Sequence, residues 1–106
     1  MSNPILSVPL ALYLIGASTG GVPTLDVRPS CEAAAAAEMI VSNKMQSCLT
    51  DEQNARDQLL KRWTKFNSTD RATCVRAAMN FEPTYTELLT CLEMSRDARK
   101  LPESLY

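Results

Sequence analysis

Histidine and a strong net charge, on which much catalysis and electrostatic recognition depend, are missing from this chain of 106 residues. It has no histidine, so the usual general base, metal ligand and near-neutral pH switch are absent. Eleven basic and 12 acidic residues leave a net charge of −1, which gives no electrostatic reason to expect nucleic acid or an anionic membrane surface as a partner. The length allows one small domain. These absences point away from histidine-dependent catalysis and from nucleic-acid binding.

No apolar run is long enough to cross a membrane. The longest, residues 5–17, is interrupted by Ser7 and Pro9, whereas a span needs about 20 apolar residues. Small residues at 16–20 follow it, as in the cleavage zone of a signal peptide, although no Lys or Arg precedes it. We predict that residues 1–18 are a signal peptide, with an uncleaved anchor as the alternative. The mature chain is then periplasmic or secreted, without stable membrane insertion.

Glycine is confined to 16–21, and two prolines mark the segment after it. Pro23 and Pro29 each restrict the preceding residue to extended conformations, so residues 19–30 are predicted to be an extended linker that Ser30 ends as a helix cap. A helical domain then occupies 31–98. The tail 99–106 contains Pro102 and is expected to fray.

Helical periodicity is clearest in residues 48–66. Ala55, Leu59, Trp63 and Phe66 recur at about 3.6-residue spacing and predict one buried stripe. Before this stretch, the alanine-rich segment from Cys31 predicts a first helix. We expect that helix to break at residues 42–43, Ser-Asn. The second helix is predicted to begin near Lys44, or alternatively near Thr50, where Gln53 completes a capping box.

Two further helices are predicted in the second half. Residues 67–70 end the second helix and cap the third, which stops at Asn80 before Pro83. Thr84 and Glu87 form a capping box for the fourth. The predicted inner faces are Ala72, Val75, Ala78 and Met79 on the third helix and Tyr85, Leu88, Leu89 and Leu92 on the fourth. The predicted fold class is all-α, a small four-helix arrangement of two helical hairpins with two disulfides.

Four cysteines form an even set, as a disulfide framework requires. Cys31 and Cys48 have the same spacing as Cys74 and Cys91, with a predicted turn inside each pair. Antiparallel helices bring such pairs to similar heights, and a bridge needs Cα atoms within about 7 Å. We therefore favour pairing within each hairpin. The alternative is a nested pairing, Cys31 with Cys91 and Cys48 with Cys74.

Most sites with a possible chemical role have a simpler structural explanation. Zinc ligands usually come in close pairs such as C-x2-C, which this chain lacks, so we expect no metal. Adjacent carboxylates at Asp51 and Glu52 suit a helix N-terminus better than acid–base work. Trp63 with Phe66 is expected to be core rather than a ligand platform. Tyr85 is expected to pack across the second hairpin with its hydroxyl in water.

From Pro23 to Ala98 the chain resembles a group of small exported alphaproteobacterial proteins of unknown function. The matching residues are 22–27 (VPTLDV), 31–34 (CEAA), 48–49 (CL), 51–52 (DE), Trp63, Cys74, 83–85 (PTY) and 87–94 (ELLTCLEM). The group has no established activity, so the resemblance implies nothing catalytic. A looser likeness, to small cysteine-stapled exported lysozyme inhibitors, rests only on the helix and cysteine pattern.

Together these observations predict an exported, non-enzymatic helical protein that binds another protein or supports envelope structure. No catalytic residue, cofactor or metal site is expected, because no positioned nucleophile–base pair can be identified. The alternatives are a small apolar-ligand carrier and a lysozyme-inhibitor-like protein.

Overall fold

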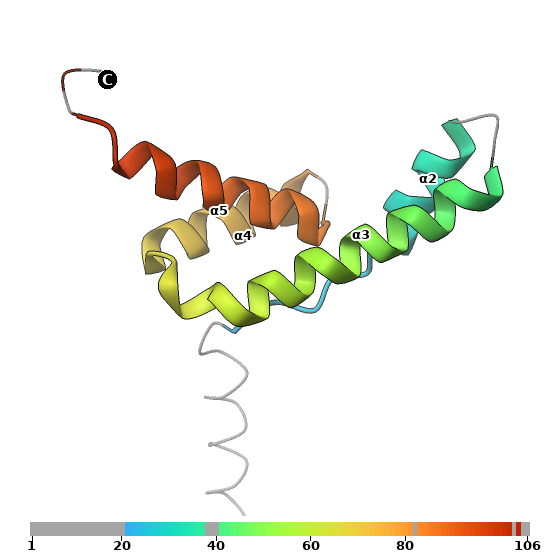
Figure 1. The fold of residues 1–106 in the computed structure, drawn as a ribbon, viewed down its shortest axis with the longest axis horizontal. Coiled ribbons are helices and arrows are strands. Elements are labelled where there is room, and N and C mark those ends of the chain that lie inside the picture. Colours follow the sequence, from blue (N-terminus) through green and yellow to red (C-terminus); the bar gives the residue numbers. More distant parts are fainter. Residues whose placement is uncertain (1–20, 38–40, 82, 103, 105–106) are drawn as a thin grey trace, which may run out of the picture.

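The computed structural model describes residues 21–37, 41–81, 83–102 and 104, and every regular element among them is helical. The elements are α2 (Arg28–Ala37), α3 (Val41–Arg62), the short 3-10 helix η1 (Trp63–Lys65), α4 (Ser68–Asn80) and α5 (Tyr85–Arg99). Figure 1 shows α3 as the long element, with α2 packed on its N-terminal half and α5 on its C-terminal half. The predicted all-α fold of two hairpins is confirmed. The predicted signal peptide lies outside the described residues.

Each disulfide closes one hairpin. Cys31 is bonded to Cys48 and Cys74 to Cys91, with Cα–Cα distances of 5.5 and 5.7 Å. The pairing within hairpins is therefore confirmed and the nested alternative is wrong. The first bridge fastens α2 to α3, and the second fastens α4 to α5.

The first helix begins three residues earlier than predicted. It starts at Arg28 and includes Pro29, which fits because a first-turn proline lacks only an N–H that would have no helical partner. The Asp26 carboxylate accepts a hydrogen bond from the Arg28 amide at 3.2 Å, and the Cys31 amide already bonds to the Val27 carbonyl. Ser30 is thus inside the helix and not its cap.

The second helix also begins earlier than predicted, at Val41. Ser42 and Asn43 lie in the first turn of α3, so the prediction of a break there is wrong, and the start lies before both Lys44 and Thr50. Ser and Asn are common both in turns and at helix starts, so the sequence at 42–43 fits a break between helices as well as the start of one. Helix α3 is 22 residues long and ends at Arg62, and the predicted stripe is buried across this boundary: Ala55 and Leu59 lie in α3, Trp63 in η1 and Phe66 just after it.

In the second hairpin the predicted caps are confirmed, but the predicted face of α4 is confirmed only in part, at Ala78 and at Val75, which packs against the core. Asn67 caps α4 by accepting from the Thr69 and Asp70 amides, and Thr84 caps α5 by accepting from the Glu87 amide. The predicted inner face of α5 is confirmed. Helix α4, however, buries Cys74 and Ala78 while Ala72 and Met79 are exposed. The bridge to Cys91 turns Cys74 toward α5, and the weakly apolar α4 has no bulky stripe to oppose that rotation.

One core joins the elements of the second half with the extended N-terminal segment. Leu59, Leu88 and Leu92 are fully buried at its centre, with Trp63 and Phe66 beside them. Segment 21–27 lies along α3, and its Leu25 belongs to the same core. This part of the predicted linker is therefore packed against the domain.

Candidate functional site

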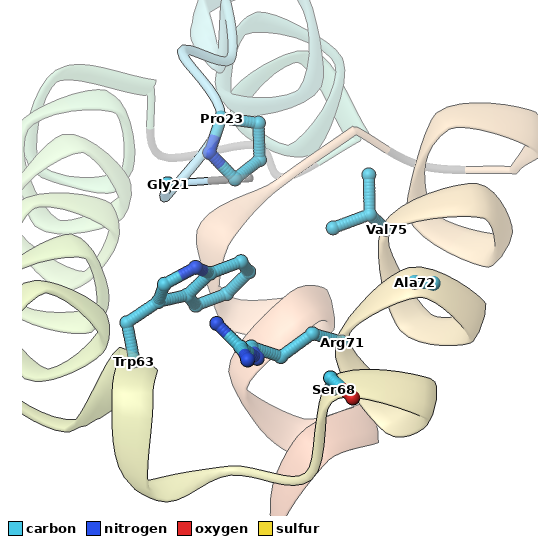
Figure 2. A pocket seen from close by; sticks show the side chains of 7 residues that line it. All are labelled: Gly21, Pro23, Trp63, Ser68, Arg71, Ala72 and Val75. Atoms are coloured by element: carbon cyan, nitrogen blue, oxygen red, sulfur yellow. The ribbon is translucent and has the colours of Figure 1, made fainter. Parts of the chain in front are cut away.

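A hollow among the described residues lies where segment 21–27, η1 and α4 meet (Figure 2). It has a volume of about 320 Å³ and is open to the surface on one side. Its lining comes from the extended segment (Gly21, Pro23), from the start of η1 (Trp63) and from α4 (Ser68, Arg71, Ala72, Val75). We call it the Trp63–Arg71 pocket.

Local structure explains why α4 forms one wall. Ser68, Arg71, Ala72 and Val75 follow the i, i+3, i+4, i+7 spacing of one helix face. The Asn67 cap sets where that helix begins, because its side chain holds two otherwise unpaired first-turn amides. Part of the face that the sequence assigned to the core thus lines the pocket instead.

The opposite wall depends on Tyr85. Its hydroxyl accepts a hydrogen bond from the Leu25 amide at 2.8 Å and donates one to the Pro23 carbonyl at 3.2 Å. The prediction of a wet hydroxyl is therefore wrong: Tyr85 is 4% exposed and its hydroxyl is used twice by segment 21–27. These two bonds fix Pro23, and with it one edge of the pocket, to the N-terminus of α5.

Trp63 and Arg71 give the pocket its chemical character. Figure 2 shows the guanidinium of Arg71 extending from α4 toward the indole ring, and its central carbon lies 5.7 Å from the ring centroid, within cation–π range. The Arg71 Nε is buried and has no hydrogen-bond partner among the described residues. A buried donor without a partner costs about 1–3 kcal/mol. The Nε itself is shielded from the pocket, which therefore combines an aromatic surface with the rest of the Arg71 guanidinium group.

The carboxylate nearest in sequence is not available to Arg71. Asp70 forms two hydrogen bonds with Arg99, at 2.7 and 2.8 Å, which tie the start of α4 to the end of α5. These bonds lower the pKa of Asp70 below its ordinary value of 3.8, the effect of hydrogen bonding outweighing desolvation. Asp70 is thus ionised and bound to Arg99 at neutral pH. Ion pairs among the described residues join Arg62 to Glu93, Arg96 to Asp97 and Arg99 to Asp70, and Arg71 takes no part in these three.

Glu52 has a role that its sequence position did not indicate. It lies in the middle of α3 rather than at a helix start, and it is 4% exposed. Its carboxylate accepts from the Tyr85 amide and from the Thr86 hydroxyl, each at 2.6 Å. Glu52 therefore caps α5 from another helix, where a negative charge is favourable. The neighbouring Asp51 is exposed, so the two carboxylates do not act as a pair.

The other sites weighed from the sequence have structural roles. Trp63 and Phe66 are core residues as predicted, at 7% and 6% exposure, although Trp63 also lines the pocket. Within the described residues there is no group of three or more His, Cys, Asp or Glu side chains that could hold a metal ion. Nor does any described helix combine the length and apolarity needed to cross a membrane.

A second, weaker surface feature lies on the hairpin of α4 and α5. Phe81 is 87% exposed, and Met94 and Met79 are 67% and 57% exposed. A hollow of about 130 Å³ beside the Cys74–Cys91 bridge is lined in part by Phe81. It offers apolar surface, but none of its described lining residues carries a buried polar atom without a partner. The Trp63–Arg71 pocket is therefore the stronger candidate.

No family model matches the chain, and neither the curated proteins nor the solved structures contain a match to it. The resemblance to exported alphaproteobacterial proteins stays a prediction.

Proposed function

We propose that this chain is an exported, non-enzymatic binding protein that holds one protruding group of a partner protein in the Trp63–Arg71 pocket. The observation that carries the proposal is the Arg71 guanidinium group beside the Trp63 ring, in a hollow that is otherwise mostly apolar. A site of this kind gains from a ligand that supplies an acceptor and apolar surface together.

The size and openness of the pocket favour a partner protein over a carried small molecule. Small-molecule sites are typically about 300–1,000 Å³ and bury most of the ligand. This pocket, at about 320 Å³ and open on one side, is at the lower end of that range. It suits the tip of a larger molecule, so the apolar-ligand carrier is the less favoured alternative.

Other observations support the proposals that the protein is exported and that it is not an enzyme. The leader-like residues 1–18 favour export, and both disulfides are formed, as is usual for proteins of oxidising compartments. Against catalysis, the pocket lining offers Ser68 no base to activate it.

Site-specific photo-crosslinking in the cell tests the proposal. A photoreactive residue is placed at Ser68, which is exposed and lines the pocket, and separately at Thr73, which is exposed on α4 but outside the pocket. We expect a crosslinked partner from Ser68 and not from Thr73. The Ala72→Leu variant, which fills the pocket from an exposed position, should abolish the product, whereas the matched Thr73→Leu variant should not.

Equal crosslinking from both positions would place the contact outside the pocket. A product that persists in Ala72→Leu would do the same. If neither position yields a crosslinked partner and the protein turns over a substrate, the binding role is wrong and the protein is an enzyme.

A further inference from the structure

We infer that the group held in the Trp63–Arg71 pocket is the C-terminal residue of the partner chain, with its carboxylate on Arg71 and an apolar side chain against Trp63. The inference rests on the proposed function, because it specifies the chemistry of that same site.

The anionic half of the ligand follows from Arg71. Its guanidinium group lines the pocket and takes no part in the ion pairs described above, and the adjacent Asp70 is held by Arg99 through two short bonds. A guanidinium stays charged at all physiological pH values and matches the planar geometry of a carboxylate. A carboxylate is therefore the acceptor that best complements this donor.

The apolar half follows from the rest of the lining. Apart from Arg71 and Ser68, the residues that line the pocket are apolar or aromatic. They are Gly21, Pro23, Trp63, Ala72 and Val75. A free inorganic anion would leave these surfaces wet. A hydrophobic side chain would cover them and exclude water from the Arg71 contact, which strengthens it.

The closeness of the two halves favours a chain end. The Arg71 guanidinium carbon is 5.7 Å from the Trp63 ring centroid, so the acceptor and the apolar group must lie within one residue of each other. An internal Asp or Glu places its carboxylate on a short stem and leaves little to cover the ring. A C-terminal residue carries its carboxylate and its side chain on the same Cα, and capture of such carboxylates is a recurring mode of peptide recognition.

Trp63 is the chain's only tryptophan, so its fluorescence reports binding at the pocket directly. The probes are the peptide acetyl-Ala-Ala-Phe with a free carboxylate and the same peptide with a C-terminal amide, titrated into the disulfide-intact chain. We expect the acid to bind at least about tenfold more tightly, since a hydrogen bond to a charged group contributes on that order.

Variants of Arg71 locate the effect. Arg71→Met should remove the preference for the acid, and Arg71→Lys, which keeps the charge but not the planar fork, should retain only part of it. Arg76→Met, which changes an exposed arginine on the same helix, is the matched control and should keep the full preference. Circular dichroism shows whether each variant is folded. If Arg71→Met does not fold, the reduced preference of Arg71→Lys for the acid tests the inference instead.

Three results would overturn the inference. They are equal binding of acid and amide, a preference for the acid that survives in Arg71→Met, and no binding of either peptide. If 3-phenylpropionate binds as tightly as the peptide acid, the occupant is a free small acid and the chain-end inference fails. Crosslinking from Ser68 reports the proposed function separately, so a partner found there with no preference for the acid would leave that function standing.

Discussion

The hydroxyl of Tyr85 forms hydrogen bonds with a distant part of the chain. Its partners are the Leu25 amide, 60 positions away, and the Pro23 carbonyl, 62 positions away. The carboxylate of Glu52 similarly reaches the start of α5 from α3. Both side chains hold backbone groups that would otherwise be buried without a partner. At the scale of single residues, they position the pocket without lining it.

Removing the Tyr85 hydroxyl is therefore expected to be costly. In Tyr85→Phe the Leu25 amide loses its acceptor, and we expect a loss of about 1–3 kcal/mol in the free energy of unfolding. Urea denaturation measures this loss, and hydrogen exchange should show faster exchange of the Leu25 amide. An unchanged exchange rate at Leu25 would show that this bond does not hold the segment.

Neutralising Glu52 tests its role as a cap on α5. Glu52→Gln keeps the shape but removes the charge at the helix N-terminus, and we expect a loss of about 1–2 kcal/mol. The matched control is Asp51→Asn, an exposed neighbour whose change should stay within about 0.5 kcal/mol. Equal effects of the two substitutions in urea denaturation would contradict a special role for Glu52.

These two residues also mark the limit of what the sequence could predict. The caps at Asn67 and Thr84 were predicted because their partners are two or three residues away. Glu52 and Tyr85 were not, because their partners lie 33 and 60 residues away and no local spacing encodes them. The pocket was missed for the same reason, since Arg71 acquires its role only when α4 meets Trp63.

At the scale of elements, each helix is held by a different combination of contacts. Helix α2 packs mainly on α3 and is bridged to it by Cys31–Cys48, whereas α5 packs on both α3 and α4. The Asp70–Arg99 pair links the open ends of α4 and α5, at 2.7 Å, away from their loop. Sequence patterns predicted the helices and their pairing, but the rotation of α4 depends on its bridge to α5 and could not be read from weak periodicity.

The Asp70–Arg99 pair should make stability depend on pH. Because the pKa of Asp70 is lower in the folded chain than its ordinary value of 3.8, the unfolded chain binds more protons in acid. The stability that ionised Asp70 contributes is present above pH 3.8 and is lost as the pH falls through the lower pKa that Asp70 has in the folded chain. We therefore expect the difference in urea midpoint between wild type and Asp70→Asn to shrink from pH 7 to pH 2.

Asp57→Asn provides the control for that measurement. Asp57 is exposed on α3 and accepts one hydrogen bond from Gln53, and no arginine pairs with it among the described residues. A difference for Asp70→Asn that does not change with pH would show that the Arg99 bonds contribute nothing to folding.

At the scale of the whole molecule, the chain contains two helical hairpins, each closed by its own disulfide, that are joined by the backbone and by a core. Each disulfide spans a sequence separation of 17, and neither crosses from one hairpin to the other. Each bridge is worth on the order of 3 kcal/mol in the chain-entropy model, a large share for a domain of this size. The halves are joined by residues 66–67 along the chain and by the packing of α3 on α5.

Cleavage at that junction should separate the halves without any reductant. A protease site inserted between Asn67 and Ser68 is cut, and the product is denatured and analysed by non-reducing mass spectrometry. We expect two fragments, each with its own bridge and with no free thiol. A single linked species, or free thiols in protein taken from its native compartment, would contradict the observed pairing.

The order of the cysteines along the chain has a consequence for biogenesis. Cys31 and Cys48 are the first two to emerge from a ribosome or a translocation channel, and they are partners; Cys74 and Cys91 emerge after them and are also partners. In an oxidising compartment entered N-terminus first, each thiol therefore meets its native partner before a competing one arrives. If the chain is exported, we expect oxidation in order of appearance to yield the native bridges directly, without a disulfide isomerase to correct them.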